Sequence, residues 1–532
     1  MSHRATVFSL TLAAAVWLWA AMVPAATIYV SKTGDGTNGN SWATAYNTVT
    51  AAVNAAATDD EIWIATGTYA EAAVLSPTVA LQVYGGFVGT EPSGYDKSLR
   101  QVFTNPTTIT VTTDRVVYLD ASGTGEVYKN FVWDGVVIAG GRPALGLPGA
   151  GMYLTCTSAT VLLNQCRFYD NRVTMAPPSG GSGTSGGALW ANTAGTSLHI
   201  TNCEFTSNSM MITYPYTTGS PGAYGVGAYV GNNLTTLTIT SCFFADNYAH
   251  GISPGASNLR VGGGGMTIAK NNLMVSGCRF ERNTVFGGTT TNSGFGGACQ
   301  VQGASVIFDR CWFVNNTVWP QSGTGGWGGA IWGPQSGAIR CINCYFTGNV
   351  TRTANNGQVL GMSNWGNGNW NLRHCTFDRN GTGGRLLANQ GNTANMHYIT
   401  NCIFANYSGQ TAVYATANTQ AFTINQTLHD GSGTASGGAT GYSITYNPTP
   451  LGAPFVNNQL QLTAGDPHLP NNLTPGGGPA IDLCPPVVPA VGDIDTVLTS
   501  TEVRPLGTGG NVDAGCDEYG WVPVALSAFS VE

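Results

Sequence analysis

The chain has 532 residues, of which only 9% are charged, and its formal net charge is −7. Ordinary soluble domains contain roughly 25% charged residues, and nucleic acid or anionic lipid calls for basic patches, so we expect neither of them as a partner. The 73 glycines favour many short strands joined by tight corners over long helices.

Residues 1–26 are predicted to be a signal peptide. His3 and Arg4 precede an apolar run at 7–23, and Pro24 with small neighbours follows it, as in a cleavable secretory signal. A membrane anchor is the alternative interpretation of this run. No other stretch is long and apolar enough to span a bilayer. We therefore expect a protein that is secreted, extracellular or on the outer cell surface, with no membrane-spanning segment after signal removal.

Residues 27–75 are expected to form an N-terminal cap. Residues 28–30 have the pattern of a strand, residues 43–57 carry apolar side chains at helical spacing, and residues 61–69 return to strand. A helix and a strand placed here would cover the open first rung of the structure that follows, whose edge would otherwise invite aggregation.

One short pattern recurs eight times between residues 161 and 407. Each copy has alternating apolar residues, then Cys-x-Phe, and usually Asn three residues after the Phe. The cysteine position is held by Cys166, Cys203, Cys242, Cys278, Cys311, Cys344, Cys375 and Cys402. A fixed position that recurs every few tens of residues is typical of a solenoid.

The spacing within one repeat predicts three strands per coil. The Gly328-Gly329 pair turns a corner at the start of a repeat. Cys341 and Cys344 face the same way although they are three residues apart, so the chain must bend between them. We predict an all-β, right-handed parallel β-helix of about a dozen coils, with handedness taken from the general preference of parallel crossovers. The repeated Phe and Asn positions would then stack as ladders.

The β-helix is predicted to occupy residues 76–430. Irregular C-terminal coils and a cap are expected at 431–520, followed by a tail at 521–532. The chain has 13 cysteines, so at least one is unpaired within the chain. We interpret the repeat cysteines as small buried hydrophobic residues. Cys484 and Cys516 lie outside the coils and could form a disulfide. We expect no metal, including at the Cys341-x-x-Cys344 motif, and no cofactor.

The residue after each repeat cysteine is expected to face solvent. On four consecutive coils it is Phe243, Arg279, Trp312 and Tyr345, which would form a strip about 15 Å long. We call these four residues the strip and predict that they bind a polysaccharide or cell-surface glycan. Cross-rung stacking that merely stabilises the sheet is the alternative.

Two further tryptophans are assigned to the same site. Trp319 and Trp327 fall in a variable loop before a Gly-Gly corner, and all the long insertions between repeats fall at that corner. One face should therefore carry most of the loops, where binding residues are usually found.

A charged cluster is the best candidate for catalysis. The repeat register brings Asp246, Arg279, Glu281, Arg282 and Asp309 onto neighbouring rungs. A pectate-lyase-like site would use carboxylates for calcium and a basic residue as the proton acceptor. The closely spaced aspartates and Gly-His-Gly of polygalacturonase-like hydrolases are absent from the repeat region at 161–407. A surface ladder of ion pairs, with Asp246 over Arg282, is the alternative.

Two family resemblances cover most of the mature chain. The Gly-Gly-Ala-Ile opening at 328–331 and the Phe-x-x-Asn endings resemble the repeats of the polymorphic outer-membrane protein family, which implies an adhesive surface β-helix. The segments at 28–30, 41–45, 64–69 and 85–91, with those at 479–482, 504–505 and 513–519, look like the ends of exported β-helix proteins of the choice-of-anchor type. That group implies the fold and export, and little about activity.

These observations favour a secreted or cell-surface β-helix protein that is not an enzyme and contacts glycans or other surfaces in adhesion or in a matrix. A polysaccharide lyase or glycoside hydrolase with the pectin-lyase-like fold is the second hypothesis. A structural filament or coat component is the third, because β-helices can stack end to end where their caps are lost.

Overall fold

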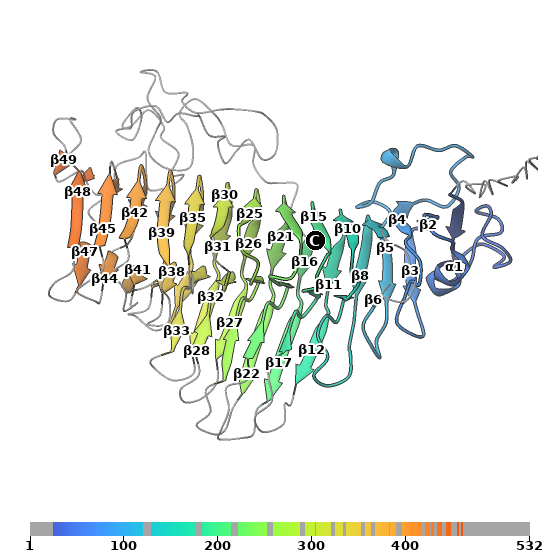
Figure 1. Ribbon diagram of the computed structural model, residues 1–532, viewed down its shortest axis with the longest axis horizontal. Coiled ribbons are helices and arrows are strands. Elements are labelled where there is room, and N and C mark those ends of the chain that lie inside the picture. The colour runs from blue at the N-terminus through green and yellow to red at the C-terminus, as the bar shows by residue number, and fades with distance from the viewer. Residues whose placement is uncertain are drawn as a thin grey trace, which may run out of the picture.

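The structure is a computed structural model that describes residues 25–460 apart from 121–128, 176–183, 214–221, 253–258, 288–292, 304, 321–324, 334–336, 353–356, 363–367, 382, 390–395, 406, 408, 416–420, 426, 430–433, 439–442, 448–454 and 457–458. The predicted signal peptide (except for its last two residues), the C-terminal tail, Cys484 and Cys516 lie outside these residues. The chain folds as a right-handed parallel β-helix whose coils stack along the long axis of the molecule (Figure 1). The predicted fold class is confirmed.

Three long parallel sheets form the walls of the helix. Sheet A contains β1 Thr27–Val30, β2 Glu61–Ala65, β4 Gln82–Phe87, β7 Lys129–Asp134, β10 Ala159–Asn164, β15 Ser197–Thr201, β20 Thr236–Thr240, β25 Leu273–Ser276, β30 Val306–Asp309, β35 Ala338–Ile342, β39 Asn369–Arg373, β42 Met396–Thr400, β45 Ala421–Asn425 and β48 Ser443–Asn447. Sheet B contains β3 Gly67–Ala70, β5 Thr107–Thr110, β8 Val136–Ala139, β11 Arg167–Tyr169, β16 Glu204–Thr206, β21 Phe243–Ala245, β26 Arg279–Glu281, β31 Trp312–Val314, β36 Tyr345–Thr347, β40 Thr376–Asp378, β43 Ile403–Ala405 and β46 Leu428–His429. Sheet C contains β6 Val117–Leu119, β9 Met152–Leu154, β14 Leu189–Ala191, β19 Ala228–Val230, β24 Met266–Ile268, β29 Cys299–Val301, β34 Ile331–Trp332, β38 Leu360–Met362, β41 Gly384–Asn389, β44 Gln410–Ala415 and β47 Thr434–Gly438.

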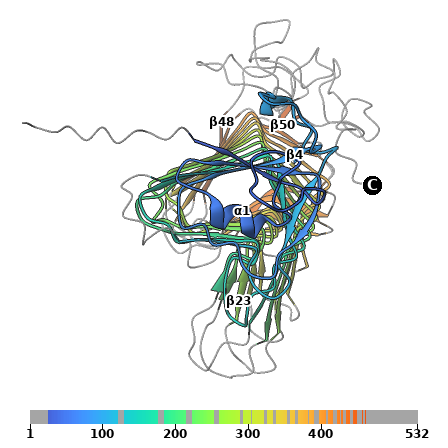
Figure 2. The same cartoon turned by 90° about the vertical axis from the view of Figure 1, so that its right-hand side faces the viewer.

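The central coils carry two more sheets, which the sequence reading did not anticipate. Sheet D contains β12 Arg172–Met175, β17 Ser209–Thr213, β22 Tyr248–Ile252, β27 Thr284–Gly287, β32 Thr317–Pro320 and β37 Val350–Thr351. Sheet E contains β13 Thr184–Ser185, β18 Gly222–Tyr224, β23 Arg260–Gly262, β28 Ser293–Phe295 and β33 Gly326–Trp327. Together they form a projection, here called the fin, that stands out from the corner between sheets B and C (Figure 2).

The fin exists because the insertions at this corner have an apolar face of their own. Val173, Met210, Val261, Val285 and Val318 belong to a buried cluster that is separate from the main core. Their neighbours in the same strands face away from it, as expected for alternating side chains. Three strands per coil is therefore wrong for the central coils, which have up to five.

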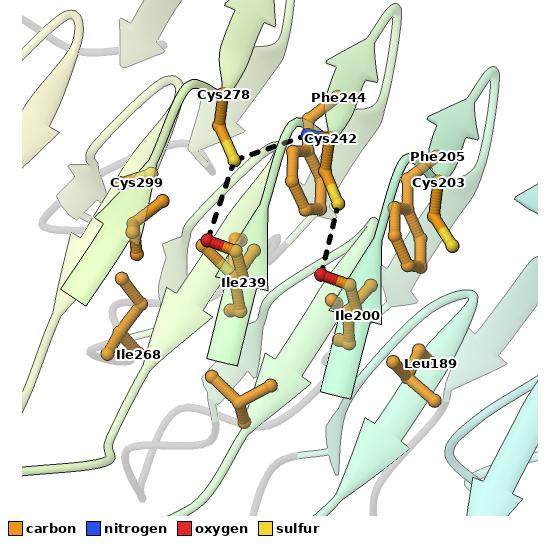
Figure 3. Close-up of a cluster of buried hydrophobic side chains, with 14 of the residues drawn as sticks. Leu189, Ile200, Cys203, Phe205, Ile239, Cys242, Phe244, Ile268, Cys278 and Cys299 are labelled. Carbon is orange, nitrogen blue, oxygen red and sulfur yellow. Dashed lines mark hydrogen bonds between the residues drawn. The ribbon is translucent and has the colours of Figure 1, made fainter. Parts of the chain in front are cut away.

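The main core is built from ladders of identical side chains. Phe168, Phe205, Phe244, Phe280, Phe313, Phe346, Phe377 and Phe404 stack face to face, with ring centroids 4.7–5.1 Å apart. Their backbones pair directly from coil to coil. Each ring lies against the rings of the neighbouring coils, and all eight are buried. Figure 3 shows two successive rings of the ladder, Phe205 and Phe244.

The cysteine ladder is buried and unoxidised. All eleven cysteines within the described residues are free thiols in the core. The Cys344 thiol lies 3.3 Å from the carbonyl oxygen of Ile342 and 3.4 Å from that of Phe308 in the preceding coil. Burial raises the pKa of Cys203, Cys278 and Cys344 well above the usual value. Cysteine suits this position because its side chain is small and apolar, and because its S–H group can donate a weak hydrogen bond to nearby backbone carbonyls.

Both corners of sheet B are made by residues in the left-handed conformation. Asn343, just before Cys344, has φ +53°, and the equivalent residues of the other repeats have similar values. The second corner carries a ladder of buried asparagines. The Asn283 amide donates to the carbonyl of Phe244 at 2.8 Å and to Oδ1 of Asn316 at 3.0 Å, and the same contacts recur from Asn171 to Asn349. Corner peptide groups that cannot join a sheet are satisfied in this way.

Helix α1, Val49–Ala55, closes the first coil (Figure 2). Val49, Ala52 and Val53 face the core, and the Glu71 carboxylate accepts hydrogen bonds from the backbone N–H groups of Val49 at 2.8 Å and Thr50 at 3.1 Å. The helix is shorter than the predicted range 43–57. The preceding residues instead pair with β1, where the N–H of Tyr46 donates to the carbonyl of Tyr29.

Candidate functional site

The strip lies on the outer face of sheet B. Backbone register places Phe243 beside Arg279, Arg279 beside Trp312, and Trp312 beside Tyr345. All four side chains point away from the core and are half-buried. The sequence reading thus placed these residues on consecutive rungs of one outward row.

The rings of the strip do not make a flat platform. Trp312 and Tyr345 meet edge to face, at 63° between ring planes and 5.3 Å between centroids. The Arg279 guanidinium lies 5.5 Å from the centre of the Trp312 ring, and its Nε is 2.6 Å from Oε2 of Glu281. The Trp312 ring and the Arg279 guanidinium, which a ligand could contact, therefore already contact other side chains of the protein.

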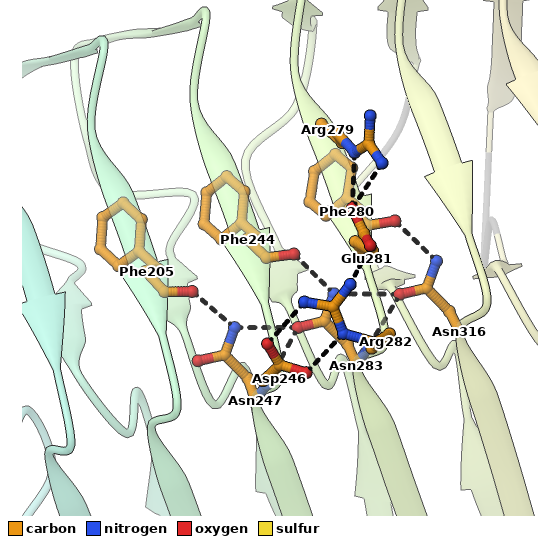
Figure 4. A network of polar contacts seen from close by, with 10 residues as sticks. All are labelled: Phe205, Phe244, Asp246, Asn247, Arg279, Phe280, Glu281, Arg282, Asn283 and Asn316. Carbon is orange, nitrogen blue, oxygen red and sulfur yellow. Dashed lines mark hydrogen bonds and ion pairs between the residues drawn. The ribbon is translucent and has the colours of Figure 1, made fainter. Parts of the chain in front are cut away.

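The charged cluster is a ladder of ion pairs at the corner between sheets B and D (Figure 4). Arg282 binds both carboxylate oxygens of Asp246, each at 2.8 Å, and also contacts Glu281. Glu281 is shared with Arg279, whose pKa is lowered by burial and by the neighbouring Arg282. Each carboxylate is thus bound to a guanidinium group, unlike the carboxyl pair of a glycosidase, which must exchange protons with the sugar.

Asp309 does not join this cluster. It is the last residue of β30 in sheet A, where it accepts a hydrogen bond from Nε of Arg310 at 2.8 Å and lies 3.3 Å from the Ser276 hydroxyl. Asp309 and Arg279 lie on neighbouring coils, as the repeat register predicts, but a bend at Arg310, with φ +50°, puts Asp309 on sheet A while Arg279 is on sheet B. In the described part of the chain, no three histidine, cysteine or acidic side chains are grouped to hold a metal ion.

Trp319 and Trp327 lie in strands rather than in a loop. Trp319 is in β32 of sheet D and is 41% exposed. Trp327 is in β33 of sheet E, beside Phe295. The two tryptophans are therefore on different walls of the fin, and only Trp319 shares its side of the molecule with the strip.

The outer face of sheet D carries an aromatic row that the sequence reading missed. Register places Met211, His250, Phe286 and Trp319 side by side. The Phe286 ring lies 4.7 Å from His250 and 6.3 Å from Trp319, and burial lowers the pKa of His250. The signal was present in the sequence as alternation after each ladder asparagine, in the runs NYAHGI, NTVFG and NTVWP.

Arg352 ends this row. Its guanidinium carbon lies 3.8 Å from the centre of the Trp319 ring, and its backbone N–H donates to the carbonyl of Val318. The four coils that carry the strip on sheet B thus continue into an outward-facing row on sheet D, in which His250 and Phe286 are half-buried and Trp319 is exposed. We call the outer face of sheet D, with Arg172 at one end and Arg352 at the other, the fin face.

A third aromatic row lies on the outer face of sheet C. Tyr118, Tyr153, Trp190 and Tyr229 stack with ring planes within 20° of parallel and centroids 4.6–6.5 Å apart. The Arg115 guanidinium lies 4.5 Å from the centre of the Tyr153 ring. These rings cover one another's faces and present their edges to solvent, so they resemble the core ladder more than a platform for sugars.

Comparison of the chain with protein-family models, with curated proteins and with solved structures found no match. The described residues include no helix long and apolar enough to cross a membrane.

Proposed function

We propose that this protein is an exported, non-catalytic β-helix protein of a cell surface or extracellular matrix, which contacts glycans through the outer faces of sheets B and D. The observation that carries the proposal is the row of Phe286, Trp319 and Arg352 beside the strip. Trp319 is exposed and Phe286 is half-buried on the same outward face, and aromatic side chains that solvent can reach interact with the apolar faces of sugar rings.

Non-catalytic action is supported by the charged cluster. Asp246, Glu281, Arg279 and Arg282 neutralise one another, which is the arrangement of a surface ion-pair ladder. A lyase of the calcium-dependent kind needs several carboxylates directed at one ion, and Asp309, which would have added another, is bonded within sheet A.

Membership of the choice-of-anchor group, and adhesion like that of polymorphic outer-membrane repeats, belong to this proposal and rest on the sequence motifs alone. The parallel stacking of the repeats agrees with both families. Export rests on the signal-like residues 1–26.

A glycan array with the full mature chain tests the proposal. We expect retention of the chain on a subset of glycans, and weaker retention after Trp319→Ala and Trp312→Ala. Tyr398→Ala is the matched control, because Tyr398 is similarly exposed, at 40%, but lies on sheet A. Loss of retention with Tyr398→Ala and not with Trp319→Ala would place the contact elsewhere.

An activity assay tests the second hypothesis, that the protein is a polysaccharide lyase or glycoside hydrolase. Reducing ends and unsaturated products are measured after incubation with pectin and alginate, and we expect neither. Product release that Arg279→Ala abolishes would establish a lyase or hydrolase and overturn the non-catalytic proposal.

A further inference from the structure

The fin is unlike the rest of this acidic chain in its charge. The chain has 27 aspartate and glutamate residues, yet none lies at 171–190, 208–230, 247–268, 283–303, 316–333 or 349–362, the segments that contain the fin strands. The same segments hold Arg172, Arg260 and Arg352. These segments therefore carry a formal charge of +3, although the whole protein has a formal net charge of −7.

Within the described residues, the two arginines of the fin face are also free of ion pairs. Arg142, Arg167, Arg279, Arg282, Arg310 and Arg379 each pair with a carboxylate. Across the residues that the structure describes, Arg172 and Arg352 have no such partner, and both side chains are exposed. Arg172 contacts the Met211 sulfur at 2.8 Å, and Arg352 stacks on Trp319. Both guanidinium groups are held by uncharged neighbours and can still take an anion.

The exposed groups between these arginines are uncharged, and apart from Thr213 they are apolar or aromatic. Tyr248 is 38% exposed and Ile252 36%, and they flank the row of His250, Phe286 and Trp319. From β12 to β37 the face crosses five steps between strands, or about 24 Å at the usual strand spacing. A long, narrow face with cations at its ends and rings between them fits an extended chain of sugars that carries negative charge.

We propose that the fin face binds an acidic polysaccharide, with its carboxylate or sulfate groups on Arg352 and Arg172 and its sugar rings against Phe286 and Trp319. The inference rests on the proposed glycan contact and specifies both its place and its ligand class. Arginine suits this task because its planar N–H groups can bind a carboxylate or sulfate through two parallel hydrogen bonds. Stacking on Trp319 fixes the plane of the Arg352 guanidinium before the ligand arrives, which lowers the entropy lost on binding.

The test uses three polymers with one backbone: dextran, carboxymethyl-dextran and dextran sulfate, each immobilised and offered to the full mature chain. We expect at least one charged dextran to bind about tenfold more tightly than dextran, as one charge-assisted contact would give. Binding should weaken as sodium chloride is raised, because exposed charges are screened. The carboxymethyl and sulfate polymers distinguish the two anionic groups.

Variants locate the contact. Arg352→Gln should remove about tenfold of the affinity for the preferred charged dextran and leave the affinity for dextran unchanged. Arg385→Gln is the matched control, since Arg385 stacks on Tyr414 of sheet C in a similar way, with its guanidinium carbon 3.1 Å from the ring centre, and it should bind as the parent does. Circular dichroism and thermal melting confirm that each variant is folded.

The outcomes separate this inference from the proposed function. Equal binding of all three dextrans, reduced by Trp319→Ala and not by Arg352→Gln, overturns the acidic ligand and leaves the glycan contact standing. Charged-polymer binding that Arg385→Gln weakens as much as Arg352→Gln places the anion elsewhere and overturns the fin face. Failure of all three polymers, together with an empty glycan array, overturns both proposals.

Discussion

The core ladders and the fin face are built from the same coils but obey different rules. In the core, phenylalanine follows phenylalanine for eight coils, with ring planes within 9° of parallel. On the fin face, methionine, histidine, phenylalanine and tryptophan follow one another in a single row. A buried rung must match the shape of the rungs above and below it, because voids and clashes are costly. A side chain at the surface does not have to match the shape of its neighbours in this way, so different residues can follow one another there and can serve to bind a ligand.

The largest expected effect lies inside the ladder. Phe313→Ala should lower the free energy of unfolding by about 3–5 kcal/mol, from lost burial and the cavity left between Phe280 and Phe346. Urea unfolding of the parent and the variant measures it. A change below about 0.5 kcal/mol, the size expected at an exposed position, would mean that the interior is not packed as described.

The asparagine ladder should be nearly as sensitive. Asn316→Ala removes the donor to the carbonyl of Phe280 at 2.8 Å and the acceptor for the Asn283 amide at 3.0 Å. Each buried partner would lose one hydrogen bond, although the Asn283 amide keeps its bond to the carbonyl of Phe244, and we expect a cost of about 2–4 kcal/mol in unfolding free energy. Thr317→Ala, at the next residue but outward-facing, is the control and should change stability by less than about 1 kcal/mol. Similar losses in both variants would contradict a special role for the ladder.

Stability should fall in weak acid because of His397. Burial lowers the pKa of His397 to about 3, and an unfolded imidazole titrates near pH 6.5. Between these pH values the unfolded chain binds a proton that the folded chain does not. The contribution of the neutral His397 ring to the unfolding free energy is therefore fully present above about pH 6.5 and is lost as the pH falls. This residue should remove about 2 kcal/mol of unfolding free energy between pH 6.5 and 5. His397→Gln provides the control, and an unchanged pH profile in that variant would assign the loss to other groups.

A smaller effect is expected in the cysteine ladder. Cys311→Ala should cost about 1–2 kcal/mol, since little volume is lost and the fold persists. Its thiol lies 3.4 Å from the carbonyl oxygens of Asp309 and Val275, and these weak contacts go with it. Thiol titration in denaturant should also find at least eight free thiols in the purified protein. Complete oxidation of the repeat cysteines would disprove the ladder as described.

The fin face should be the least sensitive to truncation. Trp319→Ala is expected to lower unfolding free energy by less than about 1 kcal/mol, because the side chain is 41% exposed and its main neighbours are Phe286 and Arg352. Thermal melting measured beside Phe313→Ala gives the contrast directly. Equal destabilisation in the two variants would show that the fin face, like the core, is maintained for stability.

The sequence was sufficient for the core because the core repeats. Once Cys, Phe and Asn recur at fixed positions, period-two alternation decides which side chains face inward, and a bend between Cys341 and Cys344 follows from their three-residue separation. The strip could be read in the same way, since Trp312 and Tyr345 directly follow ladder cysteines. Each of these assignments depended only on counting residues from a repeated position.

The spacing of residues in the sequence did not show how the inserted segments fold or which charged side chains form ion pairs with one another. The fin arises because Val173, Met210 and Val261, in segments of different length, bury one another, and no repeated spacing marks that contact. Counting placed Asp309 one rung from Arg279, but only the structure showed that the bend at Arg310 puts the two on different sheets. The sequence by itself therefore determined the ladder positions and the helix they build, because neighbouring coils must match. Only the tertiary structure decided which outward side chains share a face, because that depends on how far each corner turns.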